Sequence, residues 1–354
     1  MIFDLNKNIF GLDISDRAIR LIKVSKQGKK ITLNSFNELE IPDGIIVNGE
    51  IIQEDKLADL IKKLVSSTKG RKINIKNVIS VLPETKTFIK VIDIPINRDK
   101  KEFNIDDLVK KEIVNHIPLN PDEIYLDWQI VSEDSDNIKI LIGAAPQAIV
   151  NSYSLALEKG GLIPYVLEIE AVAIVRGLIE EEDNKTKIII DFGAARTGLI
   201  LYDNKTIKFT ASLPISGNKI TETIAQTLKL EYQKAEEAKI VCGLDPNKCE
   251  GALLKILLTN IDSLIRQIKK TITYYQSNFA DHNDISEIII CGGGANFGEI
   301  DQLLSEKLKI PVKIGNPFAN ITQTKKISIP KEKILSYTTA IGLALRSWYK
   351  KDII

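Results

Sequence analysis

Residues 11–22 have the sequence Gly-Leu-Asp-Ile-Ser-Asp-Arg-Ala-Ile-Arg-Leu-Ile, and residues 189–200 have the sequence Ile-Ile-Asp-Phe-Gly-Ala-Ala-Arg-Thr-Gly-Leu-Ile. The two stretches align without gaps, and each predicts an apolar strand, an aspartate, a small-residue turn and a second apolar strand. Asp191 follows Asp13 by 178 residues, half of the 354-residue chain, which is too long a period for a solenoid. The repeat predicts a duplicated domain whose two similar halves face each other.

The two turns suggest a common chemistry. A tight hairpin of small residues exposes consecutive backbone N–H groups, and such concavities hold phosphate oxygens. An aspartate at the end of the preceding strand can hold Mg²⁺ through water. Either aspartate alone could simply begin a β-turn, but the gapless duplication favours the functional interpretation. Asp13 and Asp191 are therefore expected to clamp a triphosphate and its metal from both sides.

Composition excludes several classes of protein. Hydrophobic residues make up 44% of the chain and charged residues 27%, which is a normal globular balance and argues against disorder. The 48 Lys and Arg against 47 Asp and Glu give a net charge of +1, so no global charge drives binding to nucleic acid or anionic lipid. The sequence shows neither a signal peptide nor an apolar run of the ~18 residues that a spanning helix needs.

Three cysteines in a long chain suit a reducing cytosol better than a disulfide framework. Cys242 and Cys249 have no histidine at a zinc-site spacing, so we expect buried thiols and no metal centre. The next motif, Gly292-Gly293-Gly294-Ala295, follows a predicted buried strand. Its glycines would let the backbone approach a flat or phosphorylated ligand, although a glycine run alone is a weak signal.

Apolar periodicity predicts alternating strands and helices over the rest of the chain. We expect strands at Ile9–Asp13, Ala18–Val24 and Val78–Leu82. A segment of order β-α-β-β-α follows, with strands Phe88–Ile94, Ile124–Val131 and Ile138–Ile142 and helices Ile105–Ile117 and Pro146–Lys159. Further helices are predicted at Leu167–Leu178, over the stripe from Leu254 to Tyr275, and at Tyr337–Tyr349.

Taken in order, three motifs resemble the phosphate-one, phosphate-two and adenosine motifs of the actin-like ATPase superfamily: Asp13-Ile14-Ser15, Asp191 through Thr197, and Cys291 through Ala295. Leu167–Ala173 and Tyr337–Arg346 resemble its two connecting helices, where Gly342 allows close packing. Ala235-Glu236-Glu237-Ala238-Lys239 resembles the helix that offers an acid to the ribose and a lysine near the base.

The resemblance implies an α/β, actin-like (ribonuclease H-like) fold of duplicated domains, with an inserted subdomain of the FtsA type. It implies ATP and Mg²⁺ as cofactors, Asp13 and Asp191 as metal-binding residues and Glu170 as the residue that orients water. The implied cofactor-binding residues are Asp13, Ser15, Gly193, Ala194, Ala195, Arg196, Thr197, Glu236, Lys239, Gly292, Gly293, Gly294 and Ala295. The implied subdomains are 1–85 with 165–186 and 334–354, the insert 86–164, 187–215 with 285–333, and a helical nucleoside-side part, 216–284.

Within this superfamily the chain most resembles the PilM family of type IV pilus assembly, from Phe10 to about Trp348. The insert contributes Val91–Pro95, His116-Ile117-Pro118 and Tyr125-Leu126-Asp127-Trp128 to the match. The resemblance implies a cytoplasmic adaptor at the inner face of the membrane. It would bind the N-terminal cytoplasmic peptide of a PilN-like inner-membrane protein between the first subdomain and the insert. Pilus motor ATPases and self-association are further implied contacts; nucleic acid and direct membrane insertion are not.

The first motif departs from the family pattern. Ser15 stands where the family usually has glycine, and Asp16 and Arg17 stand where it has small hydroxyl residues. Serine tolerates a positive φ less well than glycine, and Asp16 would place a negative charge near a phosphate. We therefore expect nucleotide binding with slow hydrolysis at most.

Three alternatives remain at this stage. An FtsA-like division protein has a similar insert but needs a terminal amphipathic anchor, and Lys350–Ile354 follow the predicted hinge helix directly. A small-molecule kinase needs a general base in a substrate pocket, and beyond Glu168 and Glu170 no extra acid stands near the motifs. A heat-shock chaperone needs a further substrate domain. It also stays open whether the strands of the insert dock a peptide or only close the insert's own core.

Overall fold

The computed structural model describes residues 9–96, 104–117, 119–245, 247–319, 321–323 and 327–349. The first half is built on a seven-stranded sheet of order β11-β7-β1-β2-β3-β17, with β6 paired to β3. Its strands are β1 (Phe10–Ile14), β2 (Ala18–Gln27), β3 (Lys30–Glu40), β6 (Lys69–Gly70), β7 (Asn77–Leu82), β11 (Ile163–Ile169) and β17 (Ile321–Thr322). A separate two-stranded ladder joins β4 (Ile46–Val47) and β5 (Glu50–Ile51).

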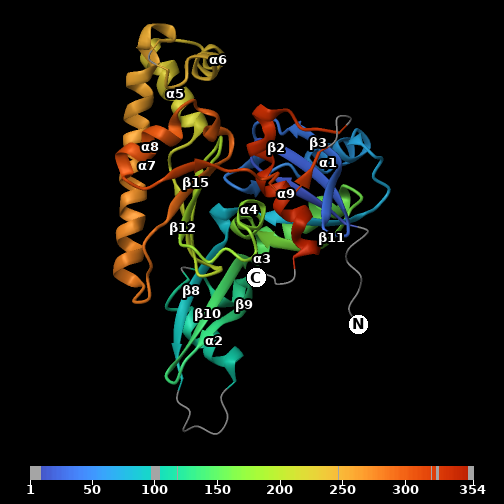
Figure 1. Ribbon diagram of the computed structural model, residues 1–354. Coiled ribbons are helices and arrows are strands. Elements are labelled where there is room, and N and C mark those ends of the chain that lie inside the picture. Colours follow the sequence, from blue (N-terminus) through green and yellow to red (C-terminus); the bar gives the residue numbers. More distant parts are fainter. Residues whose placement is uncertain are drawn as a thin grey trace.

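The second half is built on an eight-stranded sheet of order β16-β15-β12-β13-β14-β8-β10-β9. Its strands are β8 (Phe88–Pro95), β9 (Ile124–Glu133), β10 (Asn137–Pro146), β12 (Lys187–Phe192), β13 (Thr197–Asp203), β14 (Thr206–Leu213), β15 (Glu287–Cys291) and β16 (Val312–Ile314). The strands of the insert therefore extend the sheet of the second half (Figure 1). The junction is a single residue pair, Phe209 with Lys90.

The duplication predicted from the sequence is confirmed in the register of the strands. In the first hairpin Asp13 pairs with Arg20 and Ile14 with Ile19; in the second, 178 residues later, Asp191 pairs with Gly198 and Phe192 with Thr197. Each first strand also pairs in parallel with a later strand, β1 with β7 and β12 with β15. Order β3-β2-β1-β7-β11 in one sheet thus matches β14-β13-β12-β15-β16 in the other.

Helices cover these sheets and connect them. The α-helices are α1 (Glu54–Ser66), α2 (Ile105–Ile113), α3 (Gln147–Lys159), α4 (Glu170–Leu178), α5 (Gly217–Leu228), α6 (Tyr232–Cys242), α7 (Ala252–Asn278), α8 (Ile300–Leu308) and α9 (Thr338–Leu345). Short 3₁₀ helices are η1 (Glu84–Lys86), η2 (Pro121–Glu123), η3 (Cys249–Gly251), η4 (Gly293–Asn296), η5 (Lys331–Tyr337) and η6 (Arg346–Trp348). Helix α4 belongs to the core of the second half, α9 packs on β1, and their mutual contact joins the halves (Figure 1).

Three helix predictions need correction. Leu167–Ile169 is the end of strand β11 and not the start of a helix, because it pairs in parallel with β7 up to Ile169 with Leu82. Helix α2 ends at Ile113, four residues before the predicted end. The last helix spans only Thr338–Leu345 between two 3₁₀ segments. The segment 350–354, on which the argument against a terminal anchor depends, lies outside the described residues.

The insert has a core of its own, in which Ile92, Ile140 and Ile142 of the strands pack with Val109 and Ile113 of α2. Helix α3 behaves differently. Its Tyr153, Ala156 and Leu157 are buried in the core of the first half, beside Leu57 and Ile61 of α1. A deletion that should remove only the β8–β10 part of the insert must therefore stop before α3.

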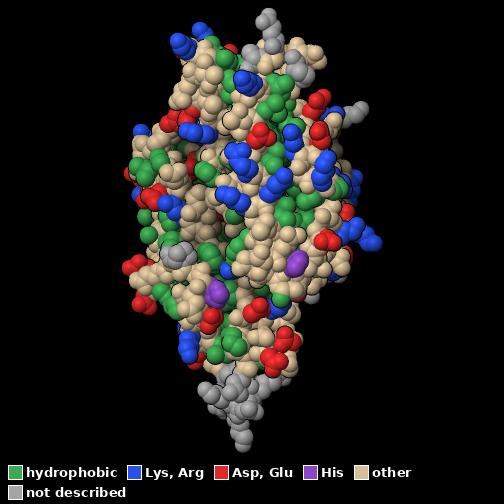
Figure 2. Space-filling model, turned by 90° about the vertical axis from the view of Figure 1, so that its left-hand side faces the viewer, with side chains coloured by type: hydrophobic (Ala, Val, Ile, Leu, Met, Phe, Trp, Pro, Cys, Tyr) green, Lys and Arg blue, Asp and Glu red, His purple; other side chains and the backbone are tan. Residues whose placement is uncertain are grey.

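The long helix α7 is amphipathic. Leu257, Ile261, Leu264 and Ile268 are buried in the core of the second half, whereas charged side chains such as Asp262, Arg266 and Lys269 are exposed. Figure 2 shows lysine and arginine side chains over the face that carries α7, with acidic side chains around them. No helix within the described residues is long and apolar enough to cross a bilayer.

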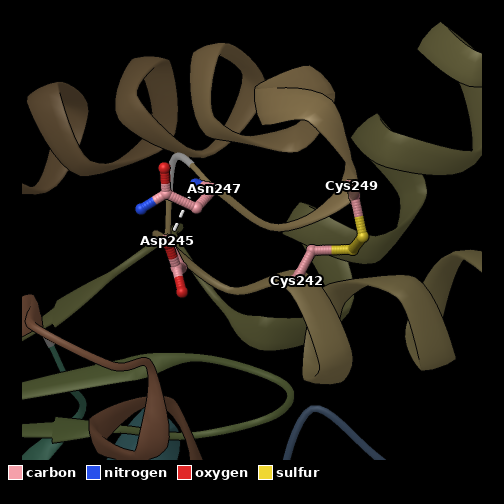
Figure 3. Close-up of a disulfide and its surroundings, with 4 residues drawn as sticks. All are labelled: Cys242, Asp245, Asn247 and Cys249. Atoms are coloured by element: carbon pink, nitrogen blue, oxygen red, sulfur yellow. Dashed lines mark hydrogen bonds between the residues drawn. A yellow bond between two sulfur atoms is a disulfide. The ribbon is translucent and has the colours of Figure 1, made fainter.

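The cysteine prediction is wrong for two of the three residues. Cys242 at the end of α6 and Cys249 at the start of η3 form a disulfide with a Cα–Cα distance of 5.8 Å (Figure 3). The spacing of the two cysteines in the sequence alone did not reveal that their side chains meet. Cys291 is a buried free thiol, as predicted.

We expect Gly342→Ala to destabilise the protein strongly. A Cβ at Gly342 would lie 1.8 Å from the backbone oxygen of Ala173 in α4, and this backbone cannot yield locally. Overpacking of this kind costs about 3 kcal/mol, which corresponds to a fall of several degrees in Tm. Thermal unfolding measures the change, with Gly298→Ala as the control because a Cβ there has no neighbour within 4 Å. Equal Tm values for the two variants would contradict the close α4–α9 contact.

Candidate functional site

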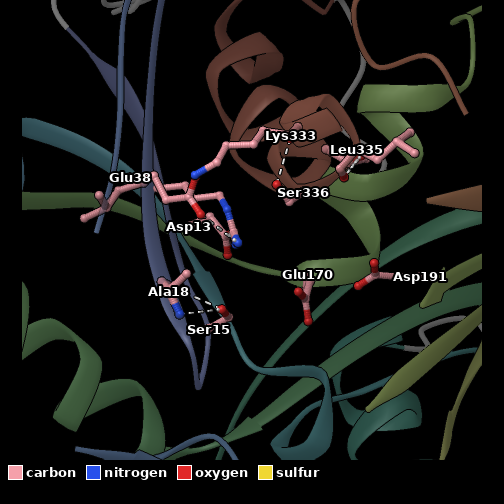
Figure 4. A network of polar contacts seen from close by, with 12 residues as sticks. Asp13, Ser15, Ala18, Glu38, Glu170, Asp191, Lys333, Leu335 and Ser336 are labelled. Carbon is pink, nitrogen blue, oxygen red and sulfur yellow. Dashed lines mark hydrogen bonds and ion pairs between the residues drawn. The ribbon is translucent and has the colours of Figure 1, made fainter. Parts of the chain in front are cut away.

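A cleft lies between the β1–β2 hairpin of the first half and the β12–β13 hairpin of the second. Its floor is formed by Asp13 and Asp191 at the ends of β1 and β12, and the start of α4 contributes Glu170. Figure 4 shows Asp13 on one side of this opening and Glu170 and Asp191 on the other. Gly193, Ala194, Ala195, Gly292 and Gly293 are among the other lining residues.

The two turns share one hydrogen-bond pattern. Ser15 N donates to Ala18 O at 3.0 Å, and Gly193 N donates to Arg196 O at 2.9 Å, so both turns close over two residues. In the described part of the chain, the backbone N–H groups of these enclosed pairs, Asp16 with Arg17 and Ala194 with Ala195, donate to no protein acceptor. Two pairs of backbone donors are thus left for an anion, from opposite sides of one cleft.

The two buried aspartates lie in surroundings that disfavour their charged forms. Burial raises the pKa of Asp13 to about 7, although Arg20 opposes the shift, and Asp13 Oδ1 has no hydrogen-bond partner. Burial, together with Glu170, raises the pKa of Asp191 to about 6. Within the described residues no three His, Cys, Asp or Glu side chains gather to hold a metal by themselves. Two carboxylates plus water and phosphate oxygens are nevertheless a ligand set that Mg²⁺ accepts, so the residues fit this ion.

Acid and base pairs surround this centre. Arg196 forms an ion pair with Glu170, and its Nε lies 3.9 Å from Glu84 Oε2. Burial raises the pKa of Glu84 to about 8, and Glu84 Oε1 has no hydrogen-bond partner. Arg20 lies 3.5 Å from both Asp13 and Glu38. The Glu170 carboxylate is therefore occupied by Arg196 in this structure.

A second depression lies on the opposite side of the β11–α4 junction. Strand β9 is the edge of the eight-stranded sheet and β11 is the edge of the seven-stranded sheet. Both line this groove, together with β7, β10 and Val172 of α4. The edges carry half-exposed apolar side chains, Tyr125 on β9 and Tyr165 on β11. At its end Glu168 holds the buried Arg176 at 2.6 Å and also pairs with Arg346.

A family model described as "Type IV pilus assembly protein PilM" matches residues 11–348. The chain belongs to the PilM family. A solved PilM–PilN type IV pilus biogenesis complex has a chain with 22% identity and a TM-score of 0.80, covering 97% of this chain and 99% of that one. MreB5 of Spiroplasma citri bound to ADP has 14% identity and a TM-score of 0.54, with 95% and 94% covered. These neighbours confirm the α/β fold of duplicated actin-like domains.

The chain is also similar to curated cell division proteins. Cell division protein FtsA of Borreliella burgdorferi is 24% identical over 303 residues, which is 79% of this chain and 68% of FtsA. FtsA of Enterococcus hirae is 22% identical over 402 residues, or 96% of this chain and 90% of FtsA. Identities of this size show a shared fold.

Most residues predicted from the resemblance to the actin-like ATPase superfamily line the cleft: Asp13, Ser15, Glu170, Asp191, Gly193, Ala194, Ala195, Arg196, Gly292 and Gly293. Thr197, Gly294 and Ala295 do not. The Thr197 hydroxyl donates to Ile215 O at 2.6 Å, and Gly294 and Ala295 are buried, Gly294 against the Phe192 ring. These three residues support the turns without lining the cleft.

Glu236 and Lys239 lie beside the cleft and not on its lining. Lys239 Nζ contacts Glu236 at 2.6 Å and donates to Gly217 O at 3.0 Å, while Gly217 N donates to Gly193 O at 3.0 Å. The pair is thus connected to the second turn through one residue. Gly292 is required locally, because its φ is +77° and a Cβ would lie 2.4 Å from Asp191 Oδ1.

The expected strain at Ser15 is absent. Ser15 is not among the described residues with positive φ, and its hydroxyl donates to Ala18 O at 3.0 Å. The Asp16 carboxylate accepts from Gly49 N at 2.9 Å, which draws it toward the 42–49 segment. The prediction of backbone strain at Ser15 is therefore wrong. The expected effect of the Asp16 charge on a bound phosphate stays a prediction.

Sequence reasoning missed the lining residues Arg17, Arg20 and Tyr153. It also missed Glu84, whose carboxylate lies 3.9 Å from Arg196 Nε beside the cleft. A signal for Glu84 existed: it follows β7, which pairs in parallel with β1, and ligands of α/β sheets bind beyond the carboxyl ends of such strands. Arg20 pairs with Asp13 across the first hairpin, a register that was not predicted. No comparable signal pointed to Tyr153, which comes from the distant helix α3.

Proposed function

We propose that this protein binds Mg²⁺-ATP between its two halves and acts as a cytoplasmic adaptor of type IV pilus or related secretion machinery. It would dock the cytoplasmic tail of a PilN-like inner-membrane protein and so be held at the inner face of the membrane. The observation that carries the nucleotide part is the pair of identical turns, each with two unused backbone donors and a buried aspartate at its base.

Each part of the cleft has a task in this proposal. The N–H groups of the two turns bind phosphate oxygens, and Asp13 and Asp191 hold the metal through water. The bound Mg²⁺ would neutralise phosphate charge. Glu236 and Lys239 stand where the resemblance places the ribose and base, and Glu170 is the candidate to orient a water molecule.

The groove supports the adaptor part. An extended peptide can add to a free strand edge, where main-chain hydrogen bonds give affinity and apolar pockets give specificity. Of the three insert strands considered, β8 and β10 lie inside the sheet, so only β9 has a free edge to offer. Strand β11 faces it from the first half. A tail laid between these edges would touch both the insert and the first half.

Calorimetry tests the proposal in two titrations of the full chain. Mg²⁺-ATP should bind at one site and raise the Tm through linkage. A synthetic peptide with the cytoplasmic tail sequence of the PilN-like protein from the same organism should also bind at one site. Failure of the peptide to bind would refute the adaptor role, and failure of ATP to bind would refute the nucleotide role.

Hydrolysis should be slow. Arg196 forms an ion pair with the Glu170 carboxylate, so this carboxylate is not available to orient a water molecule. We expect a steady-state turnover below the ~1 s⁻¹ typical of working enzymes. Phosphate release is measured for the wild type and Glu170→Ala, with exposed Glu158→Ala as the matched control. Turnover well above this value that is lost only in Glu170→Ala would show an ATPase and contradict the adaptor interpretation.

A further inference from the structure

Three arginines and no lysine stand among the described residues that line the cleft. Two of the three are committed to acids inside the protein. Arg20 lies 3.5 Å from both Asp13 and Glu38, and its side chain is 15% exposed. Arg196 pairs with Glu170 and approaches Glu84, and its side chain is 22% exposed. A charged ligand would have to compete with buried carboxylates for either of them.

Arg17 is held differently. It belongs to the tip of the first turn, its side chain is 40% exposed, and its carboxylate partner is Asp43, which is 80% exposed. An ion pair this close to water is weak, because water and salt compete with it. The guanidinium can therefore leave Asp43 at small cost, which neither of the other two cleft arginines can do.

Arg17 also reaches the other half of the molecule. The side-chain amide of Asn218, in the first turn of α5, lies 3.3 Å from Arg17 Nε and Nη2 and 3.3 Å from Tyr232 OH. When the amide is oriented to suit these neighbours, its oxygen accepts from Arg17 and its nitrogen donates to Tyr232. The backbone of Asn218 in turn donates to Ala194 O at 2.8 Å. The Arg17 guanidinium is thus linked through Asn218 to the second turn. The link lies where the first and the second turn both expose backbone N–H groups.

Arg17 lies where the phosphate end of a bound nucleotide is expected. The residues proposed for the nucleoside, Glu236, Lys239 and Gly292–Ala295, all belong to the second half. A phosphate chain that starts there runs toward the first hairpin, so its last phosphate comes nearest to Arg17. The Ser15 hydroxyl is already used by Ala18 O, which leaves the first turn without a side-chain hydroxyl donor in this position.

We propose that Arg17 recognises the terminal phosphate and makes the cleft discriminate ATP from ADP. This inference rests on the proposed binding of Mg²⁺-ATP. A planar guanidinium offers two parallel N–H donors to a phosphate, which gives a strong and directional contact. Arg17 stands at a place where the family pattern has a small hydroxyl residue.

The test is calorimetry with Mg²⁺-ATP and Mg²⁺-ADP on the full-length wild type, Arg17→Ala, Arg17→Lys and Asp43→Asn. We expect Arg17→Ala to weaken ATP about tenfold or more, as the loss of a hydrogen bond to a charged group does, and to change ADP by less than about twofold. Arg17→Lys should recover part of the ATP affinity, because it keeps the charge but not the two-pronged geometry.

Asp43→Asn separates recognition from anchoring. If Arg17 only anchors the segment around Asp43, this variant will lose as much ATP affinity as Arg17→Ala, and the inference is overturned. If Arg17 serves the phosphate, Asp43→Asn will bind ATP at least as well as the wild type. Equal loss of ATP and ADP in Arg17→Ala also overturns the inference, whereas a wild type that binds neither nucleotide overturns the proposed function itself.

Discussion

Asp191→Ala is expected to lower the affinity for Mg²⁺-ATP by about a hundredfold or more. The side chain is buried at the base of the second turn, and each hydrogen bond to a charged group contributes about 1.5–3 kcal/mol. Losing contacts to two metal-bound waters therefore lowers the affinity for Mg²⁺-ATP by at least about two orders of magnitude. Calorimetry at pH 8 measures the change, with the exposed Asp262→Ala of α7 as the control. Equal affinity in wild type and Asp191→Ala would refute the metal role.

The same site predicts a pH dependence. In the free protein the pKa of Asp13 is about 7 and that of Asp191 about 6, both above the ordinary value of 3.8, because burial disfavours their charged forms. Both protons must leave when a cation binds, so Mg²⁺-ATP affinity should rise from pH 5.5 to 8 and then level off. In the absence of nucleotide, the stability of the fold changes with pH in the opposite direction. The unfolded state ionises first, so the Tm of the free protein should fall as the pH rises from 4 to 8.

A charge placed in the groove should abolish docking of the partner tail. Leu126 is a partly buried residue of β9 that lines the groove. Leu126→Asp removes an apolar anchor and buries a carboxylate against the peptide, and we expect a loss of tail affinity of at least about thirtyfold. The matched control is Ile130→Asp on the same edge strand, where the side chain is 45% exposed and does not line the groove.

Two readouts keep this experiment decisive. Leu126→Asp should still bind Mg²⁺-ATP, because Leu126 does not line the cleft, and this binding shows that the halves around the cleft are folded. Leu126 also packs against the core of the insert, so far-UV circular dichroism of the variant checks the fold of the insert. The tail peptide is titrated in parallel into all three proteins. Tail binding by Leu126→Asp at wild-type affinity would show that the peptide docks elsewhere.

The features that follow from local patterns were predictable from the sequence. The 178-residue repeat predicted two hairpins, and the structure gives them the same register and the same closing hydrogen bond. The aspartates meet in one cleft because each ends a first strand in the same position of its half. Since the repeat is gapless, no insertion could shift one aspartate relative to its turn.

The features that depend on contacts between distant segments were not predictable in this way. Leu167–Ile169 is as apolar as the helix that follows it, and only its pairing with β7 makes it a strand. The insert was expected as a compact unit, yet its strands continue the second sheet and its helix α3 sends Tyr153 into the first core. The Cys242–Cys249 disulfide depends on how one loop turns, which spacing does not encode.

The groove is another feature that could not be predicted from the sequence. The apolar strands of the insert drew attention to peptide docking, but their pattern cannot tell an edge strand from an interior one. The sheet order decides it: β9 is at an edge and β8 is not. The counterpart edge, β11, was not predicted as a strand at all.

A crystal structure of the protein with Mg²⁺ and a non-hydrolysable ATP analogue tests the account most directly. The account predicts phosphate oxygens within hydrogen-bond distance of the backbone N–H groups of Asp16, Arg17, Ala194 and Ala195. It also predicts a metal ion between Asp13 and Asp191, bridged to both by water. A nucleotide bound elsewhere, or a cleft that stays free of nucleotide at saturating concentration, would contradict it.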